Sequence, residues 1–195
     1  MIQQHKSQSG FTLIETLIAI LILSLAIGAL LTLTAGGFFS IRYAKNDIVA
    51  SNLLQESLEY IRNTRDTAAQ ANTEWDAWYS TYRAKGCIDD NGCIVNPYAM
   101  NDNERVVACG TDCPNIIYFP TAGFYGYETS GGNYFDPFNI DTQPYPTSFV
   151  RTITIRETTN TSEPQLIVTA TMEWLNGTNR KSATQSIILT KWNLL

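Results

Sequence analysis

Few residues of this chain have the types and spacing that catalysis requires. The single histidine is His5, so removal of the first ten residues would exclude Ser-His-Asp, Cys-His and histidine–metal chemistry in the remainder. Serine, aspartate and glutamate residues are plentiful, but none are spaced in a way that specifies acid–base or nucleophilic chemistry. The sequence predicts a protein that is not an enzyme and that needs no cofactor.

Four cysteines, at positions 87, 93, 109 and 113, are the other reactive side chains, separated by five, fifteen and three residues. Paired ligands of structural zinc are usually two to four residues apart, so the first gap does not suit zinc and we expect no metal site. Two disulfides are the alternative, and three pairings are possible. We favour the local pairs, Cys87–Cys93 and Cys109–Cys113, because an Asp-Asn-Gly turn would let the first loop close.

Charge is low overall and unevenly distributed. The chain has 13 basic and 18 acidic residues, a net charge of −5, so we expect no nucleic-acid binding by this chain alone. Residues 66–141 hold 11 acids but only three bases, Arg83, Lys85 and Arg105, together with most of the aromatic residues. This region either forms a ligand-facing surface, which variants of Tyr125 and Tyr134 would test, or fills a small core beneath loops.

An uncharged run of 26 residues extends from Thr16 to Ile41. As a helix it would measure roughly 39 Å, which exceeds the ~30 Å of a bilayer's hydrocarbon core. We expect a single membrane-spanning helix over residues 11–41, with the short N-terminal side in the cytoplasm. Glu15 stands at the edge of this run, either as an interfacial acid or as a charge that awaits a partner in an assembly.

The sequence Ser9-Gly10-Phe11-Thr12-Leu13-Ile14-Glu15 resembles the class III leader of type IV prepilins and pseudopilins. The resemblance implies cleavage between Gly10 and Phe11 by a prepilin peptidase, followed by N-methylation of Phe11. It also implies that Glu15 pairs with the terminal amine of a neighbouring subunit during assembly. The implied partners are other pilin subunits, the prepilin peptidase and the inner-membrane assembly platform.

The elements that position these residues follow from periodicity. A helix is predicted from Phe11 to near Asp66, and its amphipathic half, residues 42–72, has an apolar stripe opposite its charges. The stripe comprises Ile48, Leu53 or Leu54, Leu58 and Ile61, and the charges are Asp47, Glu56, Glu59, Arg62 and Arg65. Residues 1–10 would be the leader and residues 73–195 a globular pilin head.

Within that globular part, the spacing predicts a helix over Thr73–Lys85, whose aromatic face, Trp75, Trp78, Tyr79 and Tyr82, packs on the core. Alternation predicts strands over Ser148–Glu157, Gln165–Leu175 and Lys181–Trp192, with an Asn176-Gly177 hairpin turn between the last two. Arg105–Cys109 and Ile116–Phe119 would extend the sheet, while Thr121–Pro146 would be loop. The fold class is therefore α+β, a long N-terminal α-helix packed on a C-terminal antiparallel β-sheet with disulfide-bearing loops.

Together these features predict a structural, minor subunit of a type IV pilus or pilus-like filament. The C-terminal strands resemble those of PilV-type minor pilins. Two alternatives stay open: a pseudopilin of a type II secretion or competence system, and a membrane-anchored surface protein that binds or adheres without polymerising. In each case the leader would be cytoplasmic and the globular part outside, and a pilus subunit would move from the inner membrane to the cell surface.

Overall fold

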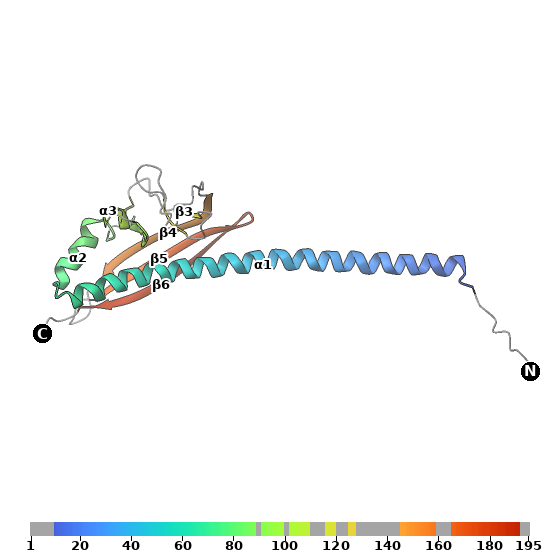
Figure 1. The fold of residues 1–195 in the computed structure, drawn as a ribbon, viewed down its shortest axis with the longest axis horizontal. Coiled ribbons are helices and arrows are strands. Elements are labelled where there is room, and N and C mark those ends of the chain that lie inside the picture. Colours follow the sequence, from blue (N-terminus) through green and yellow to red (C-terminus); the bar gives the residue numbers. More distant parts are fainter. Residues whose placement is uncertain are drawn as a thin grey trace, which may run out of the picture. The chain divides into compact units, whose positions relative to one another are not determined.

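A computed structural model of the chain describes residues 10–88, 91–99, 102–109, 116–119, 125–127, 145–158 and 165–191. Their contacts divide the chain into an N-terminal unit, Met1–Lys45, and a C-terminal unit, Asn46–Leu195. The elements, labelled in Figure 1, are α1 (Leu13–Gln70), α2 (Trp75–Ala84), β1 (Cys93–Val95), α3 (Asp102–Arg105), β2 (Val106–Ala108), β3 (Ile116–Phe119), β4 (Tyr145–Glu157), β5 (Gln165–Asn176) and β6 (Asn179–Thr190).

The strands form one antiparallel sheet of six strands, in the order β2-β1-β4-β5-β6, with β3 also paired to β4. The three long strands make its centre, and β5 pairs with β6 without interruption from Gln165↔Thr190 to Asn176↔Asn179. One face of this sheet packs against the later part of α1 (Figure 1). The predicted α+β fold, a long helix followed by an antiparallel sheet, is confirmed.

The part of α1 that belongs to the C-terminal unit buries one stripe. Leu53, Leu54, Leu58 and Ile61 lie in the core, as the helical spacing predicts, together with Ala50. The prediction for Ile48 is wrong, because its side chain is 62% exposed. The buried stripe begins two residues later, at Ala50, which is fully buried.

The remainder of the core comes from α2 and from the inward face of the sheet. Trp75, Trp78, Tyr79 and Tyr82 are all buried, which confirms the predicted aromatic face. In β5 the burial alternates along the strand, with Val168, Ala170, Met172 and Trp174 inside. Successive side chains of a strand point to opposite faces of the sheet, so every second side chain of β5 faces α1.

The hairpin between β5 and β6 is confirmed, but its central residues differ from those predicted. Asn176 pairs with Asn179, which leaves Gly177 and Thr178 as the two turn residues. Gly177 has φ +65°, the positive value that the first central residue of a type II′ turn needs. Asn176 is instead a buried strand residue, whose side-chain oxygen accepts a hydrogen bond of 2.9 Å from Asn46 Nδ2 of α1.

The shorter elements were only partly foreseen. β2 and β3 coincide with the two predicted extensions of the sheet, whereas β1 and α3, of three and four residues, were not predicted. Such short elements carry too few residues to show a period. The predicted loop Thr121–Pro146 overlaps β4, which starts at Tyr145, and most of it lies outside the described residues, as does Trp192.

Candidate functional site

The predicted processing site lies immediately before α1. Gly10, Phe11 and Thr12 are not helical, and the helix begins at Leu13. The Phe11 side chain is 79% exposed, and a Cβ added at Gly10 would meet no atom within 4 Å. The Gly10–Phe11 peptide bond therefore stands in an exposed, non-helical stretch of chain, where a protease can reach it.

Thr12 is the N-cap of α1, a role that the sequence prediction missed. Its carbonyl oxygen accepts the backbone N–H groups of Glu15 and Thr16 at 3.1 and 3.2 Å, and its Oγ1 lies 3.4 Å from the Glu15 nitrogen. Thr12-Leu13-Ile14-Glu15 has the Thr-x-x-Glu spacing of a capping box, which was the available signal. Glu15 consequently occupies the first turn, where its negative charge is favoured by the helix dipole.

No described residue of the N-terminal unit is buried. Every residue from 10 to 45 is exposed, including Leu21, Leu30 and Phe38. Among the described residues α1 is the one helix long and apolar enough to cross a membrane. The most apolar stretch of this helix contains no buried residue. So much exposed apolar surface is stable only when lipid or other helices cover it.

Four hydroxyl groups in this apolar segment are satisfied within the helix. Thr16 Oγ1 donates to the carbonyl of Leu13 at 2.8 Å, and Ser24 Oγ donates to the carbonyl of Ile20 at 2.7 Å. Thr32 and Thr34 bond in the same way one turn back. Because each hydroxyl has its own acceptor, these four polar residues add little cost to burial in an apolar environment.

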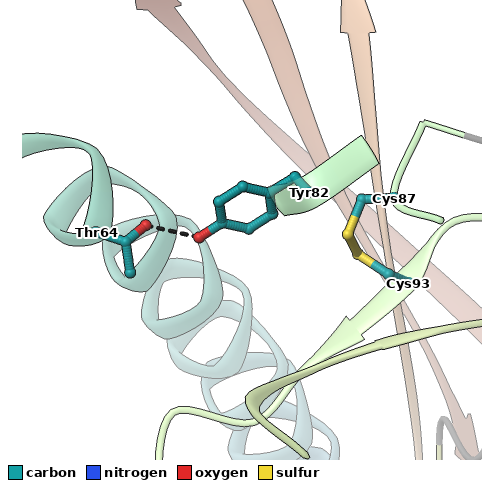
Figure 2. The surroundings of a disulfide bond; sticks show 4 residues. All are labelled: Thr64, Tyr82, Cys87 and Cys93. Atoms are coloured by element: carbon teal, nitrogen blue, oxygen red, sulfur yellow. Dashed lines mark hydrogen bonds between the residues drawn. A yellow bond between two sulfur atoms is a disulfide. The ribbon is translucent and has the colours of Figure 1, made fainter. Parts of the chain in front are cut away.

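The cysteines lie in the C-terminal unit, far along the chain from the N-terminal motif. Cys87 and Cys93 form a disulfide, the local pair that the sequence favoured, and it links the end of the α2 segment to β1 (Figure 2). Cys109 is also disulfide-bonded, while Cys113 lies outside the described residues. In the part of the chain that the structure describes, no cluster of three His, Cys, Asp or Glu residues could hold a metal ion.

The centre of the C-terminal unit contains a buried arginine that the sequence did not reveal. Arg151 is 2% exposed and lies on the inward face of β4, between Phe149 and Ile153 in the alternation. Its guanidinium donates to the backbone carbonyls of Leu53 at 2.6 Å and Val95 at 2.7 Å. It thereby joins α1, β1 and β4.

Two side chains complete the surroundings of this guanidinium. Glu56 Oε2 accepts a hydrogen bond from Arg151 at 3.0 Å, and the Tyr127 hydroxyl accepts one at 3.0 Å. Glu56 was predicted to face away from the core, but its side chain is only 24% exposed. Glu56 is partly buried because the buried guanidinium of Arg151 on β4 requires an anionic partner.

A neighbouring phenol bonds to the same carboxylate. The hydrogen bond to Glu56, with burial second, raises the pKa of Tyr98 to about 12. Burial raises the pKa of Tyr127 as well, so both phenols stay neutral at ordinary pH. The group is a hydrogen-bonded structural network, and nothing in its arrangement resembles a proton-transfer site.

Two tyrosines of the aromatic, acidic region, Tyr125 and Tyr127, lie in the core or pack against it. Tyr127 is 2% exposed, and the Tyr125 ring packs edge-on against Phe149 with centroids 6.2 Å apart. Tyr134, the other residue singled out for a ligand surface, lies outside the described residues. These contacts favour the interpretation that the aromatic side chains fill the core.

Comparison with known proteins identifies the N-terminal segment. Residues 5–31 match the family model of the prokaryotic N-terminal methylation motif. No curated protein and no solved structure matches the chain. The chain thus carries a class III leader of the type IV pilin-like kind, followed by an apolar helix.

Proposed function

We propose that the chain is a structural subunit of a type IV pilus or pilus-like filament, assembled through its N-terminal helix. The observation that carries the proposal is the methylation motif at residues 5–31, joined to a helix whose first 33 residues are all exposed. A helix that buries nothing by itself must be covered first by lipid and then by the helices of other subunits. The role is structural, so we assign it no enzymatic activity and no cofactor.

In this proposal a prepilin peptidase cuts between Gly10 and Phe11 and methylates the new amine. Cleavage before the apolar run keeps residues 11–41 in the inner membrane until the assembly platform extracts the subunit. The leader faces the cytoplasm and the C-terminal unit faces outward, where a disulfide such as Cys87–Cys93 persists. The partners are other pilins, the peptidase and the assembly platform.

Two narrower assignments accompany the proposal. We expect a minor subunit of the PilV type, on the basis of the C-terminal strands and the cysteine-rich middle. A pseudopilin of a secretion or competence machine would have the same N-terminal physics, and an anchored binding protein would not need Glu15 at the first turn. Quantitative mass spectrometry of sheared filaments separates these cases, since only a filament subunit is enriched there.

The processing step has one direct test. The protein is produced together with its prepilin peptidase, and intact-mass and N-terminal peptide spectra are recorded for the purified product. The expected mature chain starts at Phe11 and is heavier by one methyl group. A chain that starts downstream of the apolar run, near Gly36, would contradict the proposal, because no anchor would then remain.

Substitution of Glu15 tests how the subunit enters a filament. In the Glu15→Ala variant we expect normal cleavage after Gly10 but at least a tenfold loss of subunit from sheared filaments, because the charge that would pair with a neighbouring Phe11 amine is missing. The measurement is immunoblotting of the sheared and membrane fractions.

Two control variants separate this pairing role from helix capping. Thr12→Ala weakens the N-cap by about 1 kcal/mol and leaves the charge in place, so it should assemble. Glu15→Gln keeps the capping geometry without the charge, so it should fail like Glu15→Ala. If the Thr12 and Glu15 variants behave alike, the carboxylate acts only as a helix cap.

A further inference from the structure

The chain contains two Asn-Gly pairs, and the fold places them in different surroundings. Asn91-Gly92 lies in the turn before β1, and Asn176-Gly177 lies where β5 turns into β6. Asparagine loses its side-chain amide most readily when glycine follows it, because glycine has no side chain to hinder its own nitrogen and its backbone is unusually free. Each pair is therefore a candidate site of spontaneous deamidation.

This reaction needs only the asparagine, the following backbone nitrogen and water. The glycine nitrogen gives its proton to a solvent base and attacks Cγ of the asparagine. An N–Cγ bond forms, the Cγ–Nδ2 bond breaks, and ammonia leaves with a proton taken from water. Water then opens the resulting succinimide ring at one of its two carbonyl carbons, which gives aspartate or isoaspartate. No electrons are gained or lost, and a neutral amide becomes a carboxylate.

Asn176 is held in a way that opposes the reaction. Its side chain is 5% exposed, and its backbone pairs with Asn179 in the hairpin. Its Oδ1 accepts a hydrogen bond from Asn46 Nδ2 at 2.9 Å, and its Nδ2 donates to Asp47 Oδ1 at 3.5 Å. The amide can turn toward the Gly177 nitrogen only after this part of the hairpin opens, and local opening costs free energy.

Asn91 lies instead in an exposed turn, outside the strands. The glycine beside it is fixed against the sheet: the Gly92 carbonyl accepts the N–H of Cys109 at 2.9 Å, and a Cβ added at Gly92 would collide with the carbonyl oxygen of Ile153. Its φ of +69° is a value that glycine adopts without strain. The exposed Asn91 side chain can therefore approach the Gly92 nitrogen without any part of the sheet opening.

We propose that Asn91 deamidates spontaneously in the folded protein and that the fold protects Asn176 from the same reaction. One additional acid takes the net charge from −5 to −6 and places a carboxylate in the loop that the Cys87–Cys93 disulfide closes. The modified fraction grows with the age of the molecule, so this loop records the time since synthesis. The reaction belongs to the C-terminal unit and does not require that the chain enter a filament.

Timed peptide mass spectrometry of the full chain tests this proposal. The protein is kept in detergent at slightly alkaline pH with its disulfides intact, and samples are digested at acidic pH. Tandem spectra then give the fraction of peptides in which oxygen has replaced the amide nitrogen at each asparagine. Asn91 should react at least about tenfold faster than Asn176, because Asn176 must first be released by local opening.

The unfolded chain is the matched control. In concentrated guanidinium chloride, with the disulfides still intact, both pairs are open to solvent, so their rates should agree within about threefold. A difference between the two sites that appears only in the folded chain is a property of the fold and not of the local sequence.

Two variants identify the atoms involved. Asn91→Gln should not react at position 91, because glutamine would have to close a larger ring. Asn46→Ala removes the donor to Asn176 Oδ1 and should speed the reaction at Asn176 at least about threefold. The rate at Asn91 in this second variant should stay unchanged, which shows that the rest of the fold is intact.

Three results would overturn the proposal. Equal rates at the two sites in the folded chain would mean that burial does not protect Asn176. Absence of reaction at Asn91 in the folded chain, when the unfolded chain reacts there, would mean that the packing of Gly92 blocks the reaction. An unaltered rate at Asn176 in Asn46→Ala would contradict the protection assigned to that hydrogen bond. None of these outcomes bears on filament assembly.

Discussion

Arg151 is the residue through which the C-terminal unit is joined. Its three nitrogen atoms bond to α1, to β1 and to the segment that carries Tyr127, so one side chain connects parts of the chain that are up to 98 residues apart. Four of the five N–H groups of a guanidinium can be matched by such carbonyl, carboxylate and hydroxyl acceptors. A buried cation with this many partners is expensive to disturb.

Arg151→Met should therefore destabilise the protein by about 3–5 kcal/mol, because Glu56 and two backbone carbonyls lose their partner. The measurement is urea unfolding of the full chain in detergent, followed by the fluorescence of the buried tryptophans. Arg180→Met is the matched control: Arg180 pairs with Glu173 on the exposed surface, and its loss should cost less than 1 kcal/mol. Similar losses in both variants would show that the buried network adds nothing.

Tyr98 makes the same network sensitive to alkaline pH. Its pKa is about 12 in the folded chain, against about 10 when unfolded, so its contribution is complete below pH 10 and is lost as pH rises toward 12. Unfolding measured at pH 9 and pH 11 should show a smaller drop for Tyr98→Phe than for the unaltered chain. Tyr43→Phe, which removes an exposed phenol of the N-terminal unit, should leave the drop unchanged.

At the scale of elements, α1 shows how one helix serves two environments. Its residues up to 45 are exposed, and from Ala50 onward one face is buried against the sheet. The first part is apolar all round and internally hydrogen-bonded, whereas the second part is amphipathic. The β5–β6 hairpin contacts α1 close to this change, through Asn176 and Asn46.

The disulfide between α2 and β1 stabilises the C-terminal unit chiefly by restricting the unfolded chain. The bonded cysteines are six residues apart in sequence, so the loop-entropy relation gives a contribution of about 2 kcal/mol. The Cys87→Ala/Cys93→Ala variant should lose that amount in urea unfolding. Lys85→Gln, at the C-cap of α2 with the disulfide intact, controls for the effect of a nearby substitution. A loss below about 0.5 kcal/mol would mean that packing alone closes this loop.

At the scale of the molecule, the two units differ in whether they have a hydrophobic core of their own. The hydrophobic core consists entirely of residues at or after Ala50, so the C-terminal unit has a core of its own. The N-terminal unit has none among its described residues and depends on lipid or on neighbouring helices. Such a division allows one unit to be inserted, extracted and repacked while the other stays folded.

A chain restricted to residues 46–195 tests this division. It should fold without detergent, unfold cooperatively and remain monomeric, since it loses no core residue and sheds the exposed apolar surface. Analytical ultracentrifugation and thermal unfolding measure these properties. The full chain, handled identically without detergent, is the control and should aggregate. Aggregation of the shortened chain as well would show that residues before Asn46 contribute to the fold.

The sequence by itself determined what depends on local order along the chain. The leader motif, the apolar run, the aromatic face of α2 and the three long strands were all readable, because period and charge are local properties. The hairpin turn was predicted at Asn176-Gly177 but lies one residue later, at Gly177-Thr178, because the register of a hairpin depends on both strands together. Only the tertiary structure decided that Arg151 is buried and that Glu56 lies beside it. A charged side chain in an alternating strand can be buried only if acceptors from distant parts of the chain surround it. The tertiary structure also buried Asn176 and left Asn91 exposed, a difference that the two identical Asn-Gly pairs do not specify.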